Sequence, residues 1–127
     1  MVATARLSVA EHVCALREAG RRLADAAAAA GLDAAVPACE GWTVRDLTGH
    51  IGGVHRWATS IVAGARSEAT SNDEDEVFFT APGEGVIDWF EGGVVALIEA
   101  LEAADPSLDC WTFFEAPSPL AFWARRQ

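Results

Sequence analysis

Apolar residues recur at steps of three and four residues over three long stretches, and this periodicity most limits the folds open to the chain. Signals that begin helices precede two of these stretches. Ser8 followed by Glu11 has the spacing of a capping box, and Thr43 with Asp46 repeats it. A stripe of this period forms one face of an amphipathic helix. The pattern therefore predicts an all-α fold.

The four predicted helices span about residues 9–30, 43–64, 85–104 and 119–127. Ser118 and Pro119 mark the start of the last helix, because they combine a capping hydroxyl with proline at the first helical position. Asp105 and Pro106 end the third, since the residue before proline is biased away from helix. Residues 1–127 are expected to form one domain, an up-and-down four-helix bundle with a shortened fourth helix.

Residues 65–84 lie between the second and third stripes and are expected to form a long polar loop. The run SNDEDE within it is rich in acids. A calcium-binding loop alternates its acids with spacer residues and has glycine at its sixth position, and this run does neither.

Gly92 and Gly93 interrupt the third stripe at a cost of roughly 1 kcal/mol each. They suggest a close contact between helices.

Charge and composition exclude several classes of function. The net charge is −10, and residues 67–127 carry two arginines against thirteen acids. Residues 1–66 carry seven arginines against six acids, so neither half offers a basic patch for nucleic acid. The N-terminus does not resemble a signal peptide, and no stretch approaches the roughly 18 apolar residues that cross a bilayer. We expect a soluble, cytoplasmic protein without membrane or nucleic-acid partners.

The three cysteines do not form a recognisable framework. They are odd in number, far apart and in no C-x-x-C pair, which argues against disulfides and against a zinc ribbon. Cys39 lies just before the second predicted helix, where the helix dipole favours the thiolate form. Packing in an apolar context is the other interpretation of Cys39. Trp42 and Trp57 are expected to be core anchors rather than parts of a ligand pocket.

His50 falls on the inward edge of the second stripe, where a site in the bundle core could form. His55 is expected on the polar face of the same helix, and His12 belongs to the first helix. His50 has two interpretations. It is either a core histidine hydrogen-bonded to Asp46 one turn back, or a metal ligand. A divalent metal needs three or four converging ligands, and the sequence shows no second inward histidine or paired acid.

Two segments resemble a known family. VPACEGWTVRDLTGHIGGVHRWA, residues 36–58, resembles the N-terminal motif of the mycothiol-dependent maleylpyruvate isomerase family, a branch of the DinB-like bundles common in actinobacteria. CWTFFEAPSPLAFWARRQ, residues 110–127, resembles that family's lead into helix four. Glu40 replaces the proline usual before Gly-Trp. The resemblance implies that His50 is the first of three ligands to a divalent metal, usually taken as zinc.

The resemblance also implies a chemistry. In that family the metal activates the thiol of the cofactor mycothiol for attack on a small electrophile. The other two ligands, a Glu and a His four residues apart, follow the segment that ends here at Gln127, so the 127 residues are expected to hold one ligand of three. One hypothesis is an isomerase or thiol transferase whose remaining ligands come from a longer chain, a dimer mate or another subunit. The alternative is a non-catalytic truncated paralogue, a helical binding module or vestigial fragment whose open groove takes a partner helix or a second copy.

Overall fold

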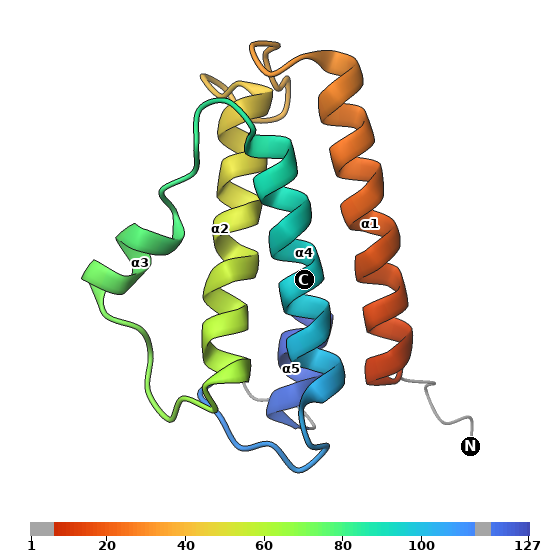
Figure 1. The fold of residues 1–127 in the computed structure, drawn as a ribbon, viewed down its shortest axis with the longest axis vertical. Coiled ribbons are helices and arrows are strands. Elements are labelled where there is room, and N and C mark those ends of the chain that lie inside the picture. Colours follow the sequence, from red (N-terminus) through yellow and green to blue (C-terminus); the bar gives the residue numbers. More distant parts are fainter. Residues whose placement is uncertain (1–6, 114–117) are drawn as a thin grey trace.

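The computed structural model describes residues 7–113 and 118–127, and it confirms the all-α fold. Four helices form where the periodicity predicts them, and a fifth, α3, is added between them. In chain order the helices are α1 (Val9–Ala30), α2 (Val44–Ala63), α3 (Asn72–Phe78), α4 (Val86–Ala103) and α5 (Pro119–Arg126) (Figure 1). Every helix in the described ranges is too short or too polar to span a lipid bilayer.

The predicted caps are present and explain where the main helices begin. The Ser8 side chain accepts a hydrogen bond from the Glu11 backbone, and the Glu11 carboxylate accepts one from the Ser8 backbone. Thr43 and Asp46 do the same at α2. Ser118 caps α5 by accepting from the backbone N–H of Ala121. These side chains satisfy N–H groups that have no partner within the helix.

The α3 helix corrects the expectation of a structureless loop over residues 65–84. Ser71 caps it through a third capping box, with Glu74 at the reciprocal position. The three acids in its first turn lie at the positive end of the helix dipole, which favours them there. The acidic run therefore contains a helix start signal. Arg66 fixes α3 to the end of α2 through two hydrogen bonds to the Glu74 carboxylate, of 2.6 and 3.0 Å.

The path of the chain departs from a strict up-and-down alternation at one connection. The segment that carries α3 returns along the length of the molecule, so α2 and α4 run in the same direction (Figure 1). The contacts between α2 and α4 agree with this, because Gly52 lies against Trp89 and Arg56 lies against Gly93. A step of four residues along one helix thus matches a step of four residues in the same direction along the other. The bundle therefore runs up, down, down and up through α1, α2, α4 and α5.

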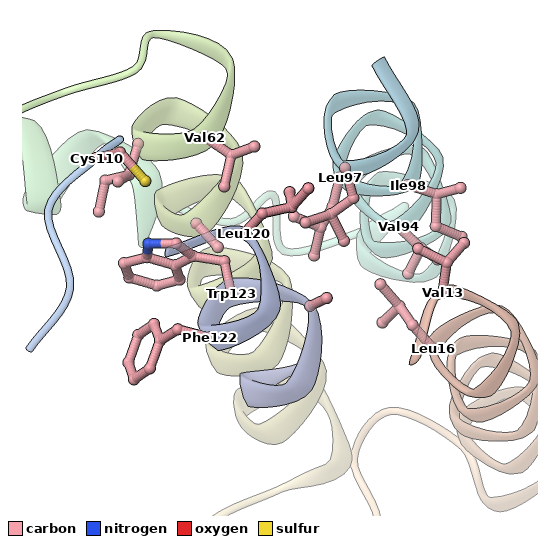
Figure 2. Packing of buried hydrophobic residues seen from close by; sticks show 14 of the residues in the cluster. Val13, Leu16, Val62, Val94, Leu97, Ile98, Cys110, Leu120, Phe122 and Trp123 are labelled. Carbon is pink, nitrogen blue, oxygen red and sulfur yellow. The ribbon is translucent and has the colours of Figure 1, made fainter. Parts of the chain in front are cut away.

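The core has an aliphatic and an aromatic part, which Figure 2 shows side by side. The aliphatic part joins α1 to α4, where Val13 and Leu16 face Val94 and Ile98. The aromatic part lies where α5 meets the end of α2. Trp123 of α5 is fully buried there, and its ring lies edge-on to other aromatic side chains. Trp111 and Phe113, in the connection before α5, also belong to this part, and residues 114–117 lie outside the described ranges.

The α5 helix covers only part of the bundle. Its eight residues extend about 12 Å, against about 30 Å for the twenty residues of α2. Figure 1 shows α5 beside the lower half of the bundle, with the C-terminus about midway along it. The N-terminal half of α2 is therefore not covered by α5.

Candidate functional site

The structure places His50 on the surface, which corrects the expectation that it lies inside the bundle. Its side chain is exposed and lies between two aromatic rings. The ring centroid of Trp42 is 5.4 Å away in an edge-on arrangement, and that of Phe79 is 5.6 Å away. The helical position of His50 is close to that of the half-buried Val54, on the side where α5 ends too early to cover it.

Asp46 is not the partner that the core interpretation of His50 requires. One oxygen of its carboxylate accepts hydrogen bonds from the backbone and the hydroxyl of Thr43, at 2.9 and 3.0 Å. The backbone hydrogen bond is the main reason that the pKa of Asp46 is lowered. The Asp46 carboxylate therefore caps the start of α2 and is not hydrogen-bonded to the His50 imidazole.

The rings beside His50 are held by the backbone around α2. Val36 and Trp42 are joined by a backbone hydrogen bond of 3.0 Å, and Ala34 accepts another from Val44 at 2.8 Å. These bonds close residues 34–44 into a turn that brings Trp42 beside the first turns of α2. Trp42 is 37% exposed, so it is not the core anchor that the sequence suggested.

His55 is buried, although the periodicity assigned it to the polar face. Only 4% of it is exposed, and its ring lies 5.6 Å from that of Phe90 on α4. Its Nδ1 atom has no hydrogen-bond partner among the described residues. Burial lowers the pKa of His55 to about 4, so the ring is neutral near pH 7. The face of α2 that looked polar is the face that packs on α4.

Glycines on α2 explain how this face can pack so closely. A Cβ atom on Gly52 would lie 2.3 Å from Cζ3 of Trp89, and one on Gly53 would lie 2.4 Å from Cδ1 of Phe79. Both distances are too short for real carbon atoms, so these positions need glycine. The pattern GG in the middle of an otherwise good helix is the sequence signal for this close approach, and a count of apolar residues does not detect it.

Arg56 also lies in this interface, and sequence reasoning did not single it out. Its Nη2 donates a 2.7 Å hydrogen bond to the backbone oxygen of Trp89, and its guanidinium carbon lies 4.5 Å from the centroid of the Trp89 ring. A Cβ atom on Gly93 would lie 3.6 Å from the Nε atom, which is an ordinary van der Waals distance. Arg56 thus packs beside α4 at Gly93, but the space there does not require glycine, so the close helix contact that the glycine pair suggested is found at Gly52 of α2 instead.

Two other predicted residues have structural roles. Trp57 is half-buried in the aromatic part of the core, 5.1 Å from Trp123, and its Nε1 donates a 2.9 Å hydrogen bond to Thr70. Packing is thus confirmed for Trp57. Cys39 lies half-buried in the turn before α2, and its N–H donates to the backbone oxygen of Val36. It is four residues from the capping residue Thr43 and therefore not at the helix end itself.

The described residues do not complete a metal centre. Over residues 7–113 and 118–127, no group of three or more His, Cys, Asp or Glu side chains is close enough to hold a metal ion. His50 offers an exposed imidazole, which suits a ligand, but a single imidazole does not hold a divalent metal. Within the part of the chain that the structure describes, His50 is thus flanked by two aromatic rings and is not part of a cluster of three candidate ligands.

Comparison with known proteins supplies the remaining evidence. Neither curated proteins nor solved structures give a match to this chain. The model of one protein family, described as the mycothiol maleylpyruvate isomerase N-terminal domain, matches residues 13–127. This match covers most of the chain, including all of α2, α4 and α5. The all-α bundle with His50 on α2 therefore belongs to the mycothiol maleylpyruvate isomerase N-terminal domain family.

Proposed function

We propose that this domain contributes His50 as one ligand of a divalent metal centre, with zinc as the expected ion, in a mycothiol-dependent isomerase or thiol transferase. The remaining ligands come from residues outside 1–127 or from a second chain. His50 would hold the metal, and a metal bound there would supply Lewis acidity that favours the thiolate form of the mycothiol thiol, the nucleophile for a small electrophilic substrate. Family membership supports the mycothiol part of the proposal.

One observation carries the proposal: His50 lies where an incoming helix can meet it. Trp57 on α2 contacts Trp123 on α5, and these two helices run in opposite directions (Figure 1). His50 precedes Trp57 by seven residues, which is two helical turns and about 10 Å along the same side of α2. A helix that continues the direction of α5 by about one turn beyond Arg126 therefore passes His50. A helix of a second copy can approach the same exposed side.

The metal content of the protein from its native cells tests this proposal. We expect close to one equivalent of divalent metal by mass spectrometry in the natural protein, and its loss in a His50→Ala variant. His12→Ala, a half-buried histidine on α1, is the matched control and should retain the metal. Metal-free natural protein, or equal metal in His50→Ala, would contradict the proposal.

A second candidate function is a non-catalytic helical binding module. The uncovered half of α2 favours it, since Leu47 and Val54 on that side remain only half-buried. In that case a partner helix or a second copy covers the side chains of α2. The two candidates differ in one result, because the binding module retains its full function in His50→Ala whereas thiol-transfer activity with mycothiol is lost in that variant.

A further inference from the structure

A cleft of about 390 Å³ lies between α2, α3 and α4, away from His50. Its volume is within the range of about 300–1,000 Å³ that small-molecule sites occupy. Arg56, Thr59 and Ser60 of α2 form one side of the cleft. The other sides are apolar and come from α3 and α4. Arg56 lies six residues after His50, which places it about 120° around the helix from His50.

Arg56 is held ready for an anion. Its guanidinium lies over the Trp89 ring at 4.5 Å, and one of its N–H groups is used by the Trp89 backbone oxygen. Five other arginines form ion pairs with carboxylates, whereas no such pair involves Arg56 within the described residues. A fixed guanidinium without an acid partner is well suited to bind a carboxylate.

The two hydroxyls of the cleft are oriented as acceptors. Thr59 donates its hydroxyl hydrogen to the backbone oxygen of His55 at 2.8 Å, and Ser60 donates to that of Trp57 at 2.7 Å. Each hydroxyl oxygen therefore keeps lone pairs that can accept a hydrogen bond. A ligand that fits the cleft carries a donor such as a hydroxyl in addition to its anionic group.

The opposite wall exposes apolar surface that a ligand would cover. Val77 on α3 is 73% exposed although it lines the cleft, and the half-buried Phe78 and Trp89 lie beside it. Removing such surface from water contributes about 25 cal/mol per Å². The wall thus favours a ligand with an aromatic or short aliphatic body.

From these three features we infer that the cleft binds a small organic acid with an aromatic or aliphatic body and a hydroxyl group. Its carboxylate pairs with Arg56, its hydroxyl donates to Thr59 or Ser60, and its body lies between Val77 and Trp89. The proposed acid binds by contacts on α2, α3 and α4 alone, so its binding does not depend on metal at His50.

Two probes of nearly the same size and shape, one anionic and one neutral, test the inference on the 127-residue chain. We expect 4-hydroxyphenylacetate to bind in calorimetric and NMR titrations at least about tenfold more tightly than the neutral 4-hydroxyphenylacetamide, because a charge-assisted hydrogen bond is worth roughly a factor of ten or more. Arg56→Gln should remove this difference. Arg17→Gln, which alters an exposed arginine on α1, is the control and should preserve it.

A second variant is needed because Arg56→Gln can disturb the packing of α2 on α4 and so weaken binding indirectly. Ala96 lines the cleft from α4, so Ala96→Phe fills the space while Arg56 remains. We expect Ala96→Phe to weaken binding of both probes, with an unchanged circular dichroism spectrum. Equal affinity for acid and amide, no binding of the acid up to about 10 mM, where affinity is only about 3 kcal/mol, or undiminished binding in both variants would overturn the inference.

Discussion

At the scale of single residues, His55 makes the stability of the domain depend on pH. Its pKa is about 4 when folded, because burial disfavours the imidazolium, against about 6.5 when unfolded. Between these values the unfolded chain binds a proton that the folded chain does not, so stability falls as the pH drops from 6.5 to 4. The full loss is roughly 3 kcal/mol. Denaturant unfolding at a series of pH values measures it.

Between pH 6.5 and 4.5 the effect of His55 on stability can be measured separately from that of the carboxylates. Hydrogen bonds from Arg66 lower the pKa of Glu74 to about 2, and this contribution is lost only as the pH falls below the ordinary value of 4.5. The free energy of unfolding of His55→Gln should therefore change little between pH 6.5 and 4.5. That of the control variant His12→Gln should still fall over this interval. An identical slope in His55→Gln would show that another group causes the dependence.

At the scale of the elements, two glycines should respond in opposite ways to alanine. Gly52→Ala places a methyl group 2.3 Å from the Trp89 ring, so we expect a net loss of about 1–2 kcal/mol from overpacking of α2 against α4. Gly92 on α4 is exposed, and the nearest atom to its added Cβ is 4.0 Å away. Gly92→Ala should therefore gain about 0.5–1 kcal/mol from helix propensity.

Chemical denaturation of the two variants checks this pair. Both substitutions have the same intrinsic effect on a helix, and their difference measures the packing alone. A gain in stability for Gly52→Ala would mean that Trp89 moves aside without cost. The contact between α2 and α4 would then be looser than the structure shows.

At the scale of the whole molecule, Trp123 joins α5 to the rest of the fold. It is fully buried, donates a 2.9 Å hydrogen bond to the backbone oxygen of Trp111, and contacts Trp57 edge-on. Trp123→Ala should cost about 3–5 kcal/mol, a large share of the 5–15 kcal/mol typical of a domain. Trp42→Ala, at a partly exposed tryptophan, should cost about 1 kcal/mol. Thermal unfolding compares the two, and equal losses would contradict this role of α5.

Helix positions were predictable from the sequence because each main helix has its own local signals. Ser8, Thr43 and Ser118 all cap the helices they predicted. The α3 helix was not predicted, because the run of acids indicated a polar loop. The capping box that Ser71 forms with Glu74 is the signal that indicates a helix there. Local signals thus specify where helices begin even in segments that look like loops.

The inward face of α2 was less predictable, because it depends on size rather than hydrophobicity. Small residues such as Gly52 and Gly53 let α4 and the segment before it come close, and this buries His55. His50, on the apolar stripe, stays exposed because α5 does not reach it. Periodicity singled out His50, and the resemblance to a family motif gave it a role as a metal ligand, but the two aromatic rings beside it became known only from the structure.

The late position of α4 in the chain has a consequence for synthesis on the ribosome. The main partner of both α1 and α2 is α4, whereas these two helices contact each other much less. Gly20 and Val94, which meet in that packing, are 74 positions apart in the chain. When the first 66 residues have emerged from the ribosome, α4, which buries their apolar faces, has not yet emerged. The apolar faces of α1 and α2 therefore stay exposed until α4 follows, and such transiently exposed surface is prone to aggregation.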